Sequence, residues 1–163
     1  DNQIAIASAG GIKPLVALVQ SGTDGQKEMA AAALRNLARN NDNQIAIASA
    51  GGITPLVALV QSSRWWCSCS RGPTARRRWR RWRCATSLAA LRNLARNNDN
   101  QIAIASAGGI KPLVALVQSG TDGHKEQAAA ALCNLARNDD NQIAIASAGG
   151  IKPLVALVQS GTD

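Results

Sequence analysis

The sequence DNQIAIASAGGIKPLVALVQS (residues 1–21) occurs four times in this chain, and the later copies begin at Asp42, Asp99 and Asp140. The copies differ at one position only, where Thr54 replaces a lysine. Successive copies begin 41, 57 and 41 residues apart. A repeat period between about 20 and 50 residues indicates a stacked array of small units rather than one closed globule.

The residue pattern of each copy predicts two helices joined by a sharp turn, called the corner below. A first helix of two turns at most follows the opening Asp-Asn pair, either of which can cap it, and ends at Gly10-Gly11. Pro14 suits the first turn of a second helix, where its missing N–H would have no partner in any case. The buried face of that helix is predicted from the spacing of Leu15, Val16, Leu18 and Val19.

A third helix fills the space before the next copy. Thr23 and Gln26 have the spacing of a capping box, which opens a helix from Lys27 to about Arg39 that Asn40-Asn41 stops. The second and third helices are expected to run antiparallel. No unit of three helices can bury its own apolar faces, so we predict an all-α stack of units.

Composition agrees with close helix packing, because 46% of the residues are hydrophobic while Phe and Tyr are absent. No stretch approaches the ~18 consecutive apolar residues of a membrane span, and the N-terminus lacks the regions of a signal peptide. The grouped cysteines do not suggest a disulfide framework. We therefore expect a soluble protein of the cytoplasm or nucleus.

These units resemble the armadillo repeat. The resemblance covers roughly residues 1–62 and 88–163 and rests on the Asn-Gln start, the AGGI corner, the Pro-Leu-Val-x-Leu-Val second helix and the Ala-Ala-x-x-Asn-Leu-Ala third helix. The related HEAT repeat has a similar period but normally two helices and no Gly-Gly corner. The resemblance implies one right-handed α-α superhelix over residues 1–163. Its expected parts are repeat 1 (1–41), repeat 2 (42–98), repeat 3 (99–139) and a half-repeat (140–163).

Residues 63–87, SRWWCSCSRGPTARRRWRRWRCATS, interrupt repeat 2. They hold all four Trp residues and eight Arg residues without an acidic residue, so the rest of the chain is electrically balanced. One hypothesis is a nucleic-acid or anionic-membrane site in segment 64–83. Its basic and aromatic patch would consist of Arg76, Arg77, Arg78, Trp79, Arg80, Arg81, Trp82 and Arg83.

The favoured interpretation is a frameshifted insertion. A slip of one base turns codons for a second helix, linker and third helix into Trp65–Ala75 and Arg76–Ser87, and the coding DNA would decide this. We expect a lengthened hairpin, with one helix from Pro55 to about Ser70 and another from Thr74 to about Asn97, joined by a turn at Gly72-Pro73. Its arginines should lie in solvent, because they cannot enter a dry core unpaired. A disordered loop over 63–75 is the alternative.

The resemblance also indicates where a ligand would bind. In importin alpha and beta-catenin, third helices line a concave groove that holds an extended peptide, and the family's groove asparagine matches Asn36, Asn93 and Asn134. Its amide can both donate to and accept from a peptide backbone. The alternative role is to satisfy helix carbonyls or water.

The charges of the third helices favour an acidic peptide. Importin alpha carries Trp four residues before the asparagine, whereas this chain has Ala32, Ala89 and Ala130, which argues against nuclear import. Arg35 and Arg92 precede the asparagine instead. Arg39, Arg96 and Arg137 follow one turn later, although the helix dipole alone also favours cations there.

No enzyme, cofactor, metal site or small-molecule substrate is predicted. His124 and Cys133 are single substitutions, expected on an exposed helix or turn, without partners spaced for metal binding or nucleophilic catalysis. We predict a protein-interaction scaffold that binds extended peptides, and nucleic acid is disfavoured. An engineered or cropped array without a native partner is a further alternative. Apolar faces left uncapped at both ends predict end-to-end self-association.

Overall fold

The structure is a computed structural model that describes residues 2–67 and 74–160, with the side chains of residues 63–83 outside the description. Every element in these ranges is an α-helix, as the sequence predicts. In chain order they are α1 (Asn2–Ser8), α2 (Ile12–Ser21), α3 (Asp24–Leu37), α4 (Asn41–Ser49), α5 (Ile53–Cys67), α6 (Thr74–Leu94), α7 (Asn98–Ser106), α8 (Ile110–Ser119), α9 (Asp122–Leu135), α10 (Asp139–Ser147) and α11 (Ile151–Ser160).

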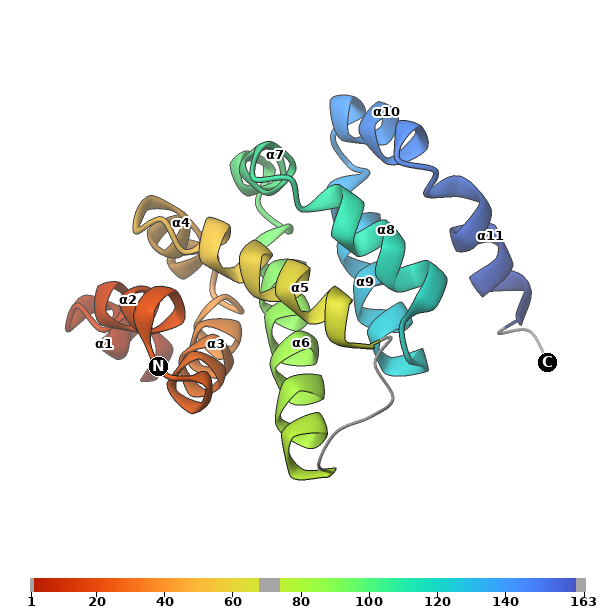
Figure 1. The fold of residues 1–163 in the computed structure, drawn as a ribbon. Coiled ribbons are helices and arrows are strands. Elements are labelled where there is room, and N and C mark those ends of the chain that lie inside the picture. Colours follow the sequence, from red (N-terminus) through yellow and green to blue (C-terminus); the bar gives the residue numbers. More distant parts are fainter. Residues whose placement is uncertain (1, 68–73, 161–163) are drawn as a thin grey trace.

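The helices form three rows along one elongated stack (Figure 1). The first helices of the units are α1, α4, α7 and α10, and each meets the second helix that follows it at 80–88°. The second helices are α2, α5, α8 and α11. The third helices α3, α6 and α9 pack against the second helices of their own units and against one another. Each unit therefore completes its core with its neighbours, as in a solenoid.

The two corner glycines of each unit have different physical roles. Gly51 adopts a φ of 76°, a left-handed conformation that glycine accepts without strain. Gly52 instead leaves room for the preceding helix, since a Cβ there would lie 2.8 Å from Ile47 Cγ2 and 3.0 Å from the Ile47 carbonyl oxygen. The pair lets the chain turn sharply while its backbone packs tightly on the first helix.

Gly52→Ala is expected to lower the free energy of unfolding by about 1–3 kcal/mol, because the added methyl group meets backbone atoms that cannot move away. Gly25→Ala serves as the matched control, since a Cβ at Gly25 in α3 meets nothing within 4 Å. That control should raise stability by about 0.5 kcal/mol, as alanine favours helix more than glycine does. Urea unfolding followed by circular dichroism measures both changes, and equal effects would contradict the proposed role of the corner.

The linker before α3 forms the predicted capping box. The Thr23 amide donates to Gln26 Oε1 at 2.8 Å, and the Gln26 amide donates to Thr23 Oγ1 at 3.4 Å. This cap starts α3 at Asp24, one turn before the predicted start at Lys27.

The Asp-Asn pair that opens each copy does not cap the first helix, in contrast to the prediction. The N-cap of α4 is Asn40, whose Oδ1 accepts from the Asn43 amide at 3.1 Å, so neither Asp42 nor Asn43 caps the helix. The Asn43 side chain instead donates to the Leu37 and Gln3 carbonyl oxygens, both at 3.2 Å. It therefore joins the end of α3 to the first helix of the preceding unit.

The same bonds recur along the stack. Asn100 Nδ2 donates to the Leu94 and Gln44 carbonyls, and Asn141 Nδ2 donates to the Leu135 and Gln101 carbonyls. We call Asn43, Asn100 and Asn141 the asparagine ladder. Since the last carbonyls of a helix lack intrahelical partners, the ladder satisfies them while it links neighbouring units.

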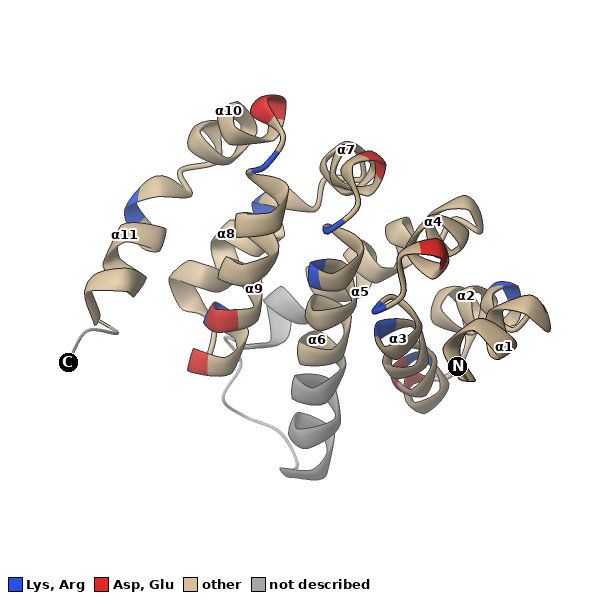
Figure 2. Ribbon diagram, turned by 180° about the vertical axis from the view of Figure 1, so that it is seen from behind, with Lys and Arg blue, Asp and Glu red and all other residues tan. Residues whose placement is uncertain are grey.

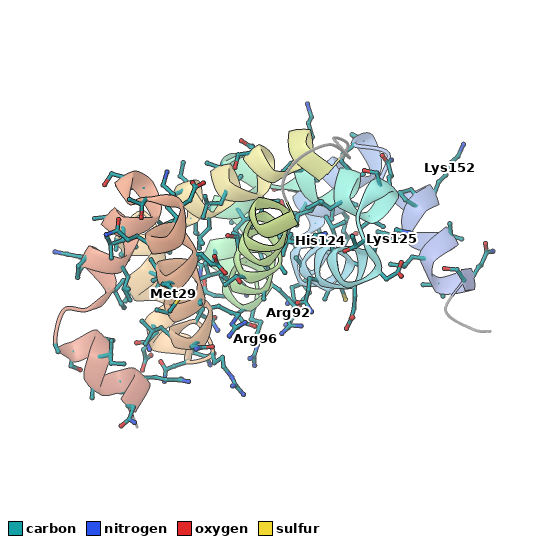
Figure 3. All side chains as sticks on the ribbon, turned by 60° about the horizontal axis from the view of Figure 1, so that its bottom comes forward. Met29, Arg92, Arg96, His124, Lys125 and Lys152 are labelled. Atoms are coloured by element: carbon teal, nitrogen blue, oxygen red, sulfur yellow. The ribbon has the colours of Figure 1, made fainter. Side chains whose placement is uncertain are left out.

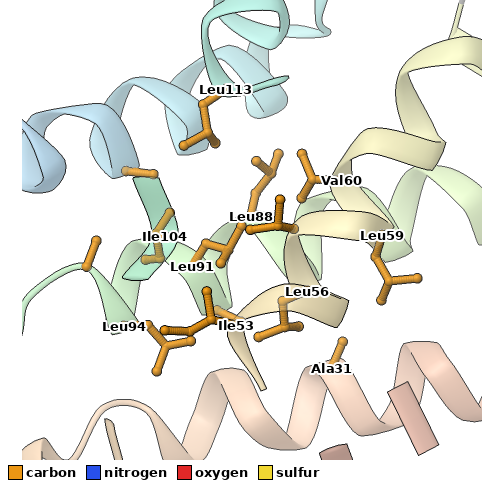
Figure 4. Packing of buried hydrophobic residues seen from close by; sticks show 14 of the residues in the cluster. Ala31, Ile53, Leu56, Leu59, Val60, Leu88, Leu91, Leu94, Ile104 and Leu113 are labelled. Carbon is orange, nitrogen blue, oxygen red and sulfur yellow. The ribbon is translucent and has the colours of Figure 1, made fainter. Parts of the chain in front are cut away.

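Aliphatic side chains from all three rows form one continuous core. Figure 4 shows Leu88, Leu91 and Leu94 of α6 among residues of the neighbouring helices, and all three are fully buried. Small buried residues such as Ala31 suit close packing of α3 against its neighbouring helices, as the composition predicts.

The insertion lengthens a hairpin, as predicted. Helix α5 has 15 residues against 10 in α2, and α6 has 21 against 14 in α3. Helix α6 begins at the predicted Thr74 but ends at Leu94, three residues before the predicted end at Asn97. Its extra seven residues add about 10 Å at 1.5 Å per residue, and its lower end projects beyond its neighbours in Figure 1. The predicted turn at Gly72-Pro73 and the end of the first helix near Ser70 lie outside the described residues.

Within residues 2–67 and 74–160, no single helix is both long and apolar enough to cross a membrane. Four bent pairs of first and second helices meet the length and composition criteria only when each pair is taken together.

Candidate functional site

The third helices present one side to solvent across three units. In α3 these residues begin at Glu28 and continue at Ala32, Arg35 and Arg39, a spacing that puts them on one side of the helix. They and their counterparts in the next two units are exposed or half-buried. Figure 2 shows α3, α6 and α9 side by side. We call this surface the third-helix face, formed by Glu28, Ala32, Arg35, Arg39, Ala85, Ala89, Arg92, Arg96, Glu126, Ala130, Cys133 and Arg137.

The asparagines beside this face hold adjacent third helices together. Asn93 Nδ2 donates to the Arg35 carbonyl oxygen at 3.0 Å, and Asn134 Nδ2 donates to the Arg92 carbonyl oxygen at 2.9 Å. Both acceptors lie in the last turn of the preceding third helix, where carbonyls lack helical partners. This is the structural role that the sequence left open as an alternative. One N–H of each amide is thus committed to the scaffold.

Asn36 differs because α3 has no earlier third helix to pack against in this structure. Its side chain is exposed, and its Oδ1 accepts from Nη2 and Nε of Arg35 at 3.1 and 3.3 Å. The three matched asparagines therefore share a sequence position but not an environment.

The arginines of the third-helix face gather at the C-terminal ends of the third helices. Figure 3 shows Arg92 and Arg96 on the same side of α6. Arg39, Arg96 and Arg137 are exposed, whereas Arg35 and Arg92 are half-buried. Across the described part of the chain, no hydrogen bond or ion pair engages the guanidinium groups of Arg39, Arg92, Arg96 and Arg137. These cations are free to meet an anionic ligand.

A row of alanines lies beside the arginines. Ala32, Ala89 and Ala130 are half-buried and occupy matched positions three residues before Arg35, Arg92 and Cys133. Their small side chains let a ligand backbone approach the helices closely. They provide no aromatic surface on which the stem of a lysine or arginine could lie.

Comparison with known proteins identifies this arrangement. A family model described as Armadillo/beta-catenin-like repeat matches residues 1–39 and 97–137. The fold is an armadillo-repeat solenoid. This confirms the family and fold that the sequence predicts, while the exact repeat boundaries stay predictions. A comparison with curated proteins gives no match.

Several solved structures resemble the armadillo solenoid of this chain. One engineered protein is 32% identical with a TM-score of 0.81, and the match covers 97% of this chain and 59% of that one. A second engineered protein is 33% identical with a TM-score of 0.80, over 96% of this chain and 35% of that one. A designed armadillo repeat protein in complex with peptide (KR)4 is 25% identical with a TM-score of 0.79, over 96% and 60%. This chain thus spans 35–60% of their lengths.

Two single substitutions of the armadillo units have different surroundings. Cys133 is exposed on the third-helix face, as predicted, and its thiol is free. His124 was predicted to be exposed but is only 3% exposed, and its Nδ1 lies 3.0 Å from Thr121 Oγ1. The histidine is therefore buried in the first turn of α9, whereas Gln26 at the matched position of α3 is exposed. Burial depends on neighbouring units, which one unit's sequence does not reveal.

The remaining candidates do not form a site within the described residues. The basic and aromatic patch Arg76, Arg77, Arg78, Trp79, Arg80, Arg81, Trp82 and Arg83 has its side chains outside them. Elsewhere in the described chain, no group of three or more His, Cys, Asp and Glu side chains could hold a metal ion.

Proposed function

We propose that this armadillo scaffold binds an extended acidic peptide along its third-helix face. The observation that carries the proposal is the repetition of arginine at matched positions on adjacent helices, Arg35 and Arg92 in one row and Arg39, Arg96 and Arg137 in the next. Neighbouring helices lie about 8–10 Å apart, and an extended chain rises about 3.3 Å per residue. Each unit would therefore meet every second or third peptide residue.

The charge of the face selects the sign of the ligand. Arginine binds carboxylates with two parallel hydrogen bonds. Among the described residues, the guanidinium groups of Arg39, Arg92, Arg96 and Arg137 have no other partner that a carboxylate would have to displace. Glu28 and Glu126 occupy the other end of the face, two turns of helix before Arg35 and Cys133. The acidic side chains of the peptide would consequently lie over the C-terminal halves of α3 and α6.

The asparagines would hold the peptide backbone. Asn93 and Asn134 each use one amide N–H for the preceding helix, which leaves a second N–H and Oδ1. One donor and one acceptor suit a peptide group in an extended chain. The designed armadillo relative is in complex with a basic peptide, whereas the arginines of this chain would repel such a ligand.

Reversing two charges on the face tests the proposal. We expect the double variant Arg35→Glu/Arg92→Glu to bind a fluorescent peptide of alternating Glu and Ala at least about fivefold more weakly, since two ion pairs become repulsive. Fluorescence anisotropy gives the affinity. The matched control is Lys13→Glu/Lys111→Glu, which makes the same charge change at exposed positions on α2 and α8. Equal losses in both variants, or equal binding of an alternating Lys and Ala peptide, would contradict the proposal.

A second variant separates this function from binding through the Arg/Trp segment. The variant has a second copy of residues 22–26 in place of residues 63–83, which removes that segment and restores the 41-residue spacing. Peptide binding on the third-helix face should survive the replacement. Nucleic-acid binding through residues 64–83 would vanish with it and would weaken steeply with added salt in the original chain.

A further inference from the structure

The two ends of the stack expose complementary apolar surfaces. At the C-terminal end, Val158 of α11 is 69% exposed, whereas its counterparts Val19, Val60 and Val117 are at most 4% exposed. Val155 is likewise exposed where its counterpart Val114 is buried. In the inner units these positions face the unit that follows. An added Cβ at the corner glycine Gly150, for example, would lie 3.1 Å from Val114 Cγ2.

The N-terminal end exposes the opposite half of the same interface. Ile6 of α1 is 47% exposed, while its counterparts Ile47 and Ile104 are fully buried. Leu18 of α2 is also exposed, although Leu59 and Leu116 are buried at the matched position. Ile4 is different, because its counterparts are exposed in every unit. Ile6 and Leu18 thus belong to the surface that receives a preceding unit.

At each end of the stack, one group lacks the hydrogen bond between units that the asparagine ladder makes elsewhere. Asn43, Asn100 and Asn141 bond the carbonyls of Gln3, Gln44 and Gln101 in the preceding unit. The next members of the two series are Asn2, which is exposed at the N-terminal end, and the Gln142 carbonyl at the other end. If one end met the other, Asn2 and Gln142 would take the places of a donor and an acceptor in the ladder.

We infer that the C-terminal end of one copy docks on the N-terminal end of a second copy, repeating the interface between inner units. Val155 and Val158 of one copy pack against Ile6 and Leu18 of the next, and Asn2 donates to the Gln142 carbonyl. The interface joins two different surfaces, so association continues into open chains instead of stopping at a dimer. No third helix follows α11 among the described residues, so contacts in the third row are missing. Association is therefore weaker than packing between inner units.

The test uses variants that block one end each. Val155→Asp/Val158→Asp blocks the C-terminal end, and Ile6→Asp/Leu18→Asp blocks the N-terminal end. All four positions are exposed, so the variants should fold, and circular dichroism checks their helix content. Ile4→Asp/Ile143→Asp is the matched control, with the same chemistry at two positions outside the interface. Sedimentation velocity over micromolar to millimolar protein gives the size distribution.

The original chain and the control should form larger species as concentration rises. Each blocked variant should stay monomeric, with association at least about a hundredfold weaker, because unpaired carboxylates would be buried. A mixture of the two blocked variants retains one competent pair of ends and should form dimers but nothing larger.

Three results would overturn the inference. They are a monomeric original chain at every concentration, continued association of either blocked variant alone, and a mixture that stays monomeric. Loss of association on replacing residues 63–83 with residues 22–26 would also overturn it, since the Arg/Trp segment would then be the contact.

Discussion

Asn100→Asp is expected to lower the free energy of unfolding by about 3–5 kcal/mol, because it places an uncompensated charge in the core. Asn100 is 2% exposed, and its Nδ2 donates to the Leu94 and Gln44 carbonyl oxygens, both at 3.2 Å. An aspartate of the same shape offers those two oxygens no donor when ionised. The substitution therefore removes one link of the asparagine ladder without creating a cavity.

Asn2→Asp provides the control for this prediction. It makes the same chemical change at the matched position of the first unit, where the side chain is exposed at the start of α1. Its effect should lie within about 0.5 kcal/mol, as for other surface substitutions. Urea unfolding at neutral pH measures both variants. Similar losses would show that the ladder does not hold the units together.

Leu91→Ala is expected to cost about 2–5 kcal/mol, the usual range for emptying a well-packed leucine site. Leu91 is 1% exposed and lies in α6, which packs against α3, α5 and α9. Figure 4 shows it between Ile104 and Ile53. Because α6 joins the units on both sides, the cavity would weaken two interfaces and the core of its own unit.

The control for Leu91→Ala is Val158→Ala on the exposed side of α11. It removes apolar atoms that have little packing to lose, so its effect should stay within about 0.5 kcal/mol in dilute protein. Thermal unfolding followed by circular dichroism compares the two. A small loss for Leu91→Ala would mean that the inserted residues have loosened the middle of the stack.

Local signals in the sequence predicted the elements that depend on neighbouring residues. Thr23 and Gln26 are three residues apart, so their capping box follows from spacing alone, and Thr74 was correctly predicted to open α6. The asparagine ladder was missed because its bonds to preceding first helices join residues 40 or 56 positions apart. The only signal is the asparagine of the Asp-Asn pair that opens every copy, and the sequence alone favours a helix cap for it.

The candidate site was predictable in position but not in its hydrogen bonds. Matched positions placed Arg35 and Arg92 beside the asparagines, and both lie on the third-helix face. The sequence could not decide whether Asn93 and Asn134 serve the scaffold, because their acceptors, the Arg35 and Arg92 carbonyls, become neighbours only when units stack.

The insertion shows how the stack accommodates a foreign sequence. Helices α5 and α6 are longer than their counterparts, yet Leu88, Leu91 and Leu94 keep the buried positions of a third helix. The added residues extend the hairpin at its outer end. The frameshift origin stays a prediction that the coding DNA tests.

The most direct test of the binding proposal is a crystal structure of the chain with the alternating Glu and Ala peptide. We predict an extended peptide across α3, α6 and α9, with its carboxylates paired to Arg35 and Arg92. Its backbone should bond to the second amide N–H and the Oδ1 of Asn93 and Asn134. A peptide bound only along residues 63–83, or on the first helices, would contradict it.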